Sequence, residues 1–119
     1  MSNKENHLRM DYIEFPCTDI EKTKKFYGAV LGWKFDDYGP EYISFFDGRL
    51  AGGFNKNARV QPCGVLVVLY ATSLKEMESK VLAAGGKIVK PVFDFPGGSR
   101  FHFTDPSGNE LAVWSEGRN

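Results

Sequence analysis

The sequence carries the same series of structural signals twice, and this repeat limits the fold more than any other feature. In each half a strand-like segment leads into a helix, and three further strand-like segments follow. The capping-box glutamates Glu21 and Glu76 lie almost as far apart as the turn aspartates Asp47 and Asp105. A repeat of this kind is typical of one supersecondary unit duplicated so that the copies share a core. The sequence therefore predicts a strand, a helix and three strands, used twice.

The first unit begins with a predicted strand over Met10–Phe15. Thr18 and Glu21 fit the S/T-x-x-E capping box, which satisfies two backbone N–H groups at a helix start. Gly32 can adopt the left-handed conformation that ends the helix. Between them lies an apolar stripe at helical spacing, formed by Ile20, Phe26, Tyr27, Val30 and Leu31. Three short strands are predicted next, in WKFDD, EYISFF and LAGGFN.

The second unit repeats this order after a polar loop at 57–62. Residues 64–70 are apolar and rich in β-branched side chains, which predicts a buried strand. Ser73 and Glu76 form the second capping box, and Gly85-Gly86 ends the helix that follows. The last three strands are predicted in KIVKPVF, SRFHFT and ELAVWS.

Charge and hydropathy exclude several classes of protein. Lys plus Arg number 15 and Asp plus Glu number 15, and no basic block marks a nucleic-acid-binding surface. No apolar run approaches the ~20 residues that cross a bilayer. Residues 1–7 are expected to form a flexible tail without an apolar signal core, so we expect a cytoplasmic location. Cys17 and Cys63 are far apart and are expected to be reduced thiols.

Four stretches resemble the vicinal oxygen chelate superfamily, which includes glyoxalase I, bleomycin-resistance proteins, fosfomycin-resistance enzymes and extradiol dioxygenases. They are YIEFPCTDIEKTKKFYGAVLGW, FFDGRLAGGF, LYATSLKEMESKVLAAGGKIVKP and FTDPSGNELAVW, in which D-P-x-G-N is the most specific piece. The resemblance implies a single α+β domain over 1–119. Two βαβββ modules, at about 8–57 and 62–116, would form curled mixed sheets with the helices outside. It also implies a cavity enclosed by two modules, within one chain or across a homodimer.

The final hairpin is predicted to have two unlike faces. If its turn centres on Ser107, cross-strand pairs form between Thr104 and Glu110, His102 and Ala112, and Arg100 and Trp114. The opposite face is uniformly apolar and should pack against the helices; it holds Phe101, Phe103, Leu111 and Val113. By the same alternation Tyr12 and Glu14 share one face of the first strand. The mixed face is either exposed to solvent or the wall of a ligand site.

The family's metal-ligand positions hold unsuitable residues in this sequence. By resemblance these positions fall on Tyr12, Gly52 or Gly53, Leu66 and Ala112, and none is a good ligand for a divalent ion. We therefore expect no metal cofactor. An alternative is a metal displaced along the strands and held by Glu14, His102 and Glu110.

The mixed faces supply the candidate ligand-binding residues, which are Tyr12, Glu14, Tyr70, Arg100, His102, Glu110 and Trp114. Arg100 beside Trp114 suits an anionic or planar ligand, or else forms a structural cation–π pair across the hairpin. His102 is the only candidate general base, although the sequence alone shows no partner that would orient it. Cys17 is interpreted as structural.

Three functions are compatible with these features. The first is a dimeric protein that binds a small, partly aromatic or anionic molecule in the cavity without metal. The second is a metal-dependent lyase, isomerase or dioxygenase with shifted ligands. The third is a protein-interaction module, which predicts a cavity filled by Trp114, Tyr12 and Phe54.

Overall fold

The computed structural model describes residues 5, 7–61 and 64–117 and has the predicted α+β architecture. The expected tail at 1–7 is thus described only at Glu5 and His7, and Cys63 lies outside the described residues. The first module contains β1 (Tyr12–Pro16), α1 (Ile20–Leu31), β2 (Lys34–Asp37), β3 (Tyr42–Phe46) and β4 (Ala51–Asn55). The second contains β5 (Val67–Tyr70), α2 (Leu74–Ala83), β6 (Lys87–Phe95), β7 (Gly98–Thr104) and β8 (Glu110–Ser115).

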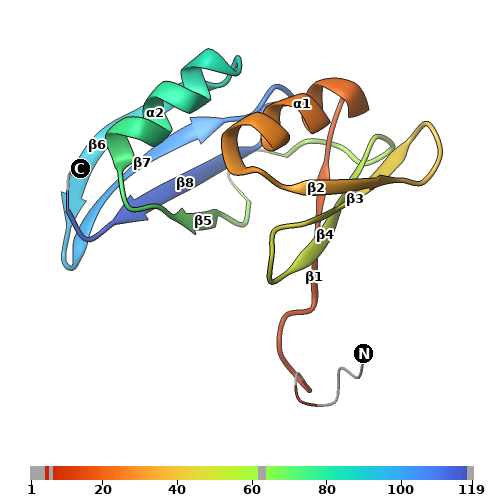
Figure 1. The fold of residues 1–119 in the computed structure, drawn as a ribbon, viewed down its shortest axis with the longest axis horizontal. Helices are drawn as coiled ribbons and strands as arrows, with labels where there is room; N and C mark the ends of the chain where they lie inside the picture. The colour runs from red at the N-terminus through yellow and green to blue at the C-terminus, as the bar shows by residue number, and fades with distance from the viewer. Residues whose placement is uncertain (1–4, 6, 62–63, 118–119) are drawn as a thin grey trace.

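Each module forms its own four-stranded mixed sheet, with the same strand arrangement in both. The order is β1-β4-β3-β2 in one sheet and β5-β8-β7-β6 in the other. In each the first strand runs parallel to the last, and the remaining neighbours are antiparallel. Both helices lie on the same side of the molecule and the two curled sheets lie side by side beneath them (Figure 1). Neither sheet closes into a barrel, so each leaves its inner face, the face away from the helices, open.

The predicted register of the last hairpin is confirmed. Arg100 pairs with Trp114, His102 with Ala112, and Thr104 with Glu110. The opposite face is fully buried beneath α2, as the apolar side chains Phe101, Phe103, Leu111 and Val113 have no exposed surface. The core continues into the first module without a break, because Phe26 of α1 packs on Phe103 of β7.

Two local predictions need correction. The N-cap of α1 is Asp19, whose side chain accepts a hydrogen bond from the Lys22 backbone at 2.9 Å, and Thr18 lies one residue too early. The predicted strand at 64–70 begins only at Val67, since Val65 is 94% exposed and continues the loop. By contrast the predicted cap of α2 is confirmed, with Ser73 accepting from the backbone N–H of Glu76.

The D-P-S-G-N turn joins the two modules. The buried Asp105 carboxylate accepts a hydrogen bond from the Tyr27 hydroxyl of α1 at 2.8 Å and another from the Asn109 side chain at 3.0 Å. The same Asn109 amide donates to the carbonyl oxygen of Pro16 in β1 at 2.7 Å. A further hydrogen bond joins the two modules, in which the Ser107 hydroxyl accepts from the Thr18 backbone N–H at 2.8 Å. We call this network of Tyr27, Asp105 and Asn109 the module clasp. It fixes β1 against the start of β8, and a site formed between those strands is therefore held by buried hydrogen bonds.

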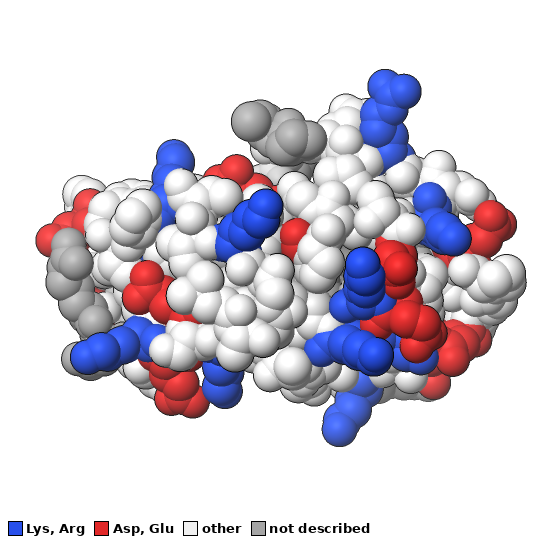
Figure 2. Space-filling view, turned by 90° about the horizontal axis from the view of Figure 1, so that it is seen from above, with Lys and Arg blue, Asp and Glu red and all other residues white. Residues whose placement is uncertain are grey.

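Acidic and basic side chains are interspersed over the helix-bearing face, where Figure 2 shows no large patch of one sign. None of the helices in the described part of the chain is long and apolar enough to cross a membrane.

Candidate functional site

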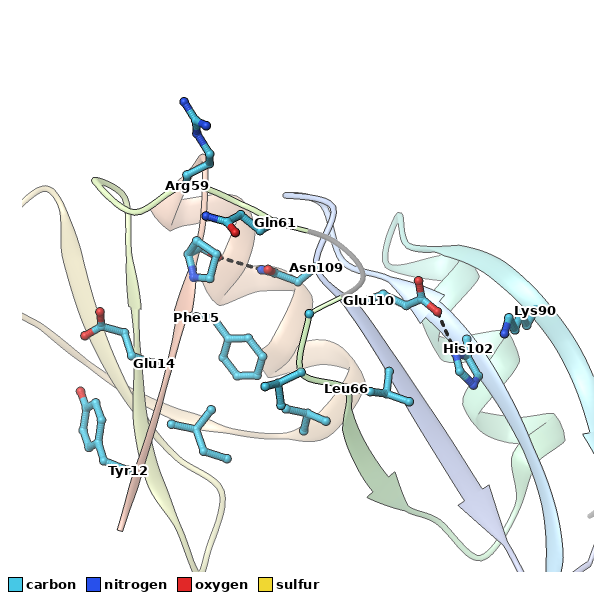
Figure 3. A pocket seen from close by; sticks show the side chains of 15 residues that line it. Tyr12, Glu14, Phe15, Arg59, Gln61, Leu66, Lys90, His102, Asn109 and Glu110 are labelled. Atoms are coloured by element: carbon cyan, nitrogen blue, oxygen red, sulfur yellow. Dashed lines mark hydrogen bonds and ion pairs between the residues drawn. The ribbon is translucent and has the colours of Figure 1, made fainter. Parts of the chain in front are cut away.

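A cavity of about 630 Å³ lies between β1 of the first module and the β7–β8 hairpin of the second. The loop that links the modules contributes a wall, through Arg59, Gln61 and Leu66 (Figure 3). We call this space the junction cavity. Its lining combines apolar side chains with polar and charged ones in similar number, and consists of Tyr12, Ile13, Glu14, Phe15, Pro16, Arg59, Gln61, Gly64, Val65, Leu66, Val67, Lys90, His102, Asn109 and Glu110.

His102 and Glu110 form a hydrogen-bonded pair on the second-module side of this cavity. His102 Nδ1 lies 2.8 Å from Glu110 Oε2, and the histidine side chain is 4% exposed (Figure 3). They sit diagonally on adjacent strands, since each pairs directly with another residue, His102 with Ala112 and Glu110 with Thr104. Diagonal neighbours are within reach of long side chains. The orienting partner of His102 that the sequence alone did not reveal is thus Glu110.

Tyr12 and Glu14 belong to a second polar network, on the inner face of the first module. The Tyr12 and Tyr42 hydroxyls are hydrogen-bonded to each other, and Tyr42 donates to Glu14 at 3.0 Å. Burial, followed by its hydrogen bonds to Tyr12 and Glu14, raises the pKa of Tyr42. Both hydroxyls lie over Gly53, where a β-carbon would overlap them. Glycine at position 53 therefore makes room for two phenols.

The other predicted ligand-binding residues lie elsewhere on the inner face of the second module and do not line the junction cavity. Trp114 contacts Tyr70 edge-on, with ring centroids 5.2 Å apart. Arg100 forms a cation–π contact, but not with Trp114 as expected. Its guanidinium carbon lies 5.4 Å from the centre of the Phe93 ring and 5.8 Å from that of the Phe95 ring. Both phenylalanines come from β6, whose irregular pairing with β7 the sequence pattern did not predict.

The residues present do not fit the metal site of the family. The described part of the chain contains no group of three or more His, Cys, Asp or Glu side chains that could hold an ion. Of the alternative ligands, His102 and Glu110 are together, but Glu14 lies across the cavity on β1 (Figure 3). A catalytic metal needs several fixed ligands and an open position, and the donor groups within this single chain do not supply them.

Two further expectations bear on the site. Phe54, expected to fill the cavity of an interaction module, is instead fully buried in the core, where it stacks on Phe15. Burial raises the pKa of the Cys17 thiol, so the thiolate is disfavoured at neutral pH and the residue suits a structural role.

Sequence reasoning missed Tyr42, Arg59, Lys90 and Asn109. Strand alternation opposite the buried Ile43 would have placed Tyr42 on the inner face with Glu14. Arg59 lies in the loop linking the modules, and no periodic pattern fixes where a loop side chain points.

Comparison with known proteins agrees with this fold. Residues 9–113 match the family model of the Glyoxalase/Bleomycin resistance protein/Dioxygenase superfamily. The proteins named "Putative glyoxylase CFP32" from Mycobacterium bovis and Mycobacterium tuberculosis are 24% identical over 120 aligned positions. The match covers 92% of this chain but 46% of each relative, so the chain spans about half the length of these curated relatives.

Solved structures of the same fold superpose on most of the chain. A glyoxalase-related enzyme from Fulvimarina pelagi has a TM-score of 0.76 at 20% identity, covering 91% of this chain and 88% of that one. A glyoxalase/bleomycin resistance protein/dioxygenase family enzyme from Burkholderia phytofirmans PsJN has a TM-score of 0.77 at 17% identity, covering 89% and 98%. The chain belongs to the Glyoxalase/Bleomycin resistance protein/Dioxygenase superfamily.

Proposed function

We propose that this chain binds a small, planar, partly aromatic or anionic molecule in the junction cavity, without the divalent metal of the family's metal enzymes. The observation that carries the proposal is the cavity itself, whose volume of about 630 Å³ is within the range of small-molecule sites. Its apolar surface, including Phe15, Leu66 and Val67, is suited to the body of such a ligand.

The polar groups of the cavity favour a ligand with negative charge. Glu14 and Glu110 already accept hydrogen bonds, from Tyr42 and from His102 respectively. The cations Arg59 and Lys90 also line the cavity, and neither forms an ion pair with another described residue. Unpaired cations beside an apolar wall attract a planar anion, because the guanidinium and ammonium groups can neutralise it.

The same fold supports a homodimer closed through the inner faces. Four apolar side chains on those faces are more than two-fifths exposed: Tyr12 (45%), Phe46 (49%), Val68 (42%) and Tyr70 (51%). A second hollow, of about 590 Å³, lies on the inner face of the first module between Tyr12 and Phe46. Exposed apolar side chains on both inner faces suit an interface, and a second copy would cover them. Sedimentation at several concentrations tests this, and a Phe46→Glu variant should shift the equilibrium toward the monomer.

Binding is tested with 8-anilinonaphthalene-1-sulfonate, an aromatic anion whose fluorescence rises in an apolar site. We expect saturable binding that is unchanged by a chelator. Leu66→Trp should weaken it by filling the cavity, whereas the control Leu82→Trp, at a helix position that is 57% exposed, should not. Equal binding by both variants would place the probe elsewhere and contradict the proposal. Near-stoichiometric metal in the purified protein, lost together with probe binding on chelation, would favour the metal-dependent lyase, isomerase or dioxygenase.

A further inference from the structure

The second hollow, of about 590 Å³ on the inner face of the first module, is lined by aromatic rings from three segments of the chain. Tyr12 comes from β1, Tyr42 and Phe46 come from β3, and Tyr38 directly follows β2. Tyr38 is held opposite Tyr42, because its backbone N–H donates to the Tyr42 carbonyl oxygen at 3.0 Å. Tyr12, Tyr38 and Phe46 are each more than two-fifths exposed, so a ligand can reach these rings. We call this space the aromatic hollow.

Asp36 is the only charged residue among the described residues that line the aromatic hollow. It pairs with Ser44 of β3, and its carboxylate has no ion pair or hydrogen bond with another described residue. The next carboxylate, that of Asp37, faces the other side of the sheet, where it lies 3.1 Å from Lys24 of α1. The hollow therefore carries a negative charge that the described part of the chain does not neutralise.

The hydrogen bonds of the tyrosines determine which hydroxyl groups can still donate. A phenol has one hydrogen, and Tyr42 donates its hydrogen to the Glu14 carboxylate at 3.0 Å. In the hydrogen bond between the two hydroxyls, Tyr12 is then the donor and Tyr42 the acceptor. Neither phenol has a hydrogen left for a ligand, and both oxygens offer only lone pairs. This arrangement disfavours an anion and suits a ligand with positive charge.

The rings favour the same kind of ligand. The face of an aromatic ring is the negative end of its quadrupole and attracts a cation, and sets of such rings recognise quaternary ammonium groups. The junction cavity has the opposite preference, because it is lined by the cations Arg59 and Lys90. Tyr12 borders both spaces, yet each is suited to a ligand of a different charge.

We propose that the aromatic hollow binds a small organic ammonium ion, which lies against the rings of Tyr12, Tyr38 and Phe46 with Asp36 as its counter-ion. The site is separate from the junction cavity and does not depend on ligand binding there.

The test compares two cations with a neutral molecule of the same shape. The cations are choline and 2-dimethylaminoethanol, which is protonated at neutral pH. The neutral molecule is 3,3-dimethyl-1-butanol, which has a carbon atom in place of the choline nitrogen. We expect both cations to bind the full chain about tenfold more tightly than the alcohol, and the amide signals of β2 and β3 to shift most in nuclear magnetic resonance titrations. Equal affinity for all three, or shifts confined to other elements, would overturn the proposal.

Variants then test the counter-ion and the rings. Asp36→Asn should weaken choline binding about fourfold. Asp37→Asn is the matched control, since it removes the same charge from the opposite face of the sheet, and it should bind choline like the wild type. Tyr38→Leu, at an exposed position that should tolerate the change, should weaken binding about threefold. The same affinity in Asp36→Asn and Asp37→Asn would show that no specific counter-ion exists, and the proposal would fail.

The outcomes separate this site from the other two proposals. Choline should not displace 8-anilinonaphthalene-1-sulfonate, and displacement would place the cation in the junction cavity and overturn the present proposal. Choline binding in a chain that lacks Leu66-dependent binding of that probe would support the aromatic hollow and contradict only the proposed function. Choline affinity should stay constant as the protein concentration rises. A decline that follows dimer formation in sedimentation would show that a second copy fills the hollow, and would also overturn the proposal.

Discussion

Asp47 and Asp105 occupy equivalent turns in the two modules, between the third and fourth strands of each, but they differ in burial and in the contacts they make beyond the turn. Asp47 is exposed and accepts hydrogen bonds from the backbone N–H groups of Arg49 and Leu50 in its own turn. Asp105 is 4% exposed and accepts from its own turn, from Asn109 and from the Tyr27 hydroxyl of the other module. The repeated sequence thus encodes the turn in both modules. Only the second turn belongs to the module clasp, because α1 of the first module packs against it.

The inner faces differ in the same way. Gly53 of β4 and Ala112 of β8 both lie on the inner faces of their sheets. Gly53 lies beneath two tyrosine hydroxyls, and Ala112 lies opposite His102. The space over Gly53 is therefore occupied by two tyrosine side chains, whereas His102, the neighbour of Ala112, lines the junction cavity. The two sheets have the same topology, but different side chains surround the small residue on each inner face, and these side chains determine the local chemistry.

Breaking the module clasp should have the largest effect. Asp105→Ala leaves the Tyr27 hydroxyl and buried N–H groups without an acceptor, so we expect the free energy of unfolding to fall by about 3 kcal/mol. Asp47→Ala, the matched change in the exposed turn, should cost about 0.5 kcal/mol. Urea unfolding measures both. Equal losses would show that the two turns contribute alike and that the clasp does not join the modules.

The adjacent glycines of β4 face opposite sides of the sheet, Gly52 the core and Gly53 the inner face. A β-carbon at Gly52 would overlap the backbone oxygen of Ile13 and the buried Phe45 ring, so Gly52→Ala should cost about 2 kcal/mol. At Gly53 the overlap is with the ends of Tyr12 and Tyr42, which can move, so Gly53→Ala should cost less than about 1 kcal/mol. Chemical denaturation gives the costs, and ultraviolet titration should show an altered tyrosine network only in Gly53→Ala. The reverse order of costs would contradict the assignment of faces.

The clasp also predicts an alkaline loss of stability. Burial, followed by the Asp105 charge, raises the pKa of Tyr27 well above its usual value. The unfolded chain then loses the phenolic proton first, so stability should be full below about pH 10 and should fall above it. Tyr27→Phe should cost about 1 kcal/mol at neutral pH and reduce the alkaline decline. Tyr38→Phe, at a position 65% exposed, is the control. An identical decline in Tyr27→Phe and wild type would argue against a buried Tyr27 hydroxyl.

The smallest test concerns the start of α1, where Thr18 and Asp19 are neighbouring candidates for the N-cap. Asp19→Ala should destabilise the fold by about 1 kcal/mol because it removes the cap of α1. Thr18→Ala should cost less than about 0.5 kcal/mol, since the exposed Thr18 hydroxyl has only a 3.3 Å contact with Ser107. Thermal unfolding ranks the two variants, and a larger loss for Thr18→Ala would restore the capping box that the sequence pattern suggested.

Much of the fold could be predicted because its signals are local. Alternation placed Phe101, Phe103, Leu111 and Val113 in the core and set the final register, and apolar stripes located both helices. The same alternation put His102 and Glu110 on one face, although their contact is diagonal and was not inferred. The cap of α1 was misplaced by one residue, since Thr18 and Asp19 both suit the position and only the backbone path decides between them.

By itself the sequence determined the duplicated unit, its strands and helices, the faces of the last hairpin and the family resemblance, because each depends on neighbours within a few residues or one strand. The tertiary structure decided that Tyr27 meets Asp105, that Tyr42 joins Tyr12 and Glu14, and that Arg59 and Lys90 share a cavity with His102. These contacts depend on how one module packs against the other and how each sheet curls. Both are set by the sum of many side-chain contacts distributed along the chain, and no local pattern encodes that sum.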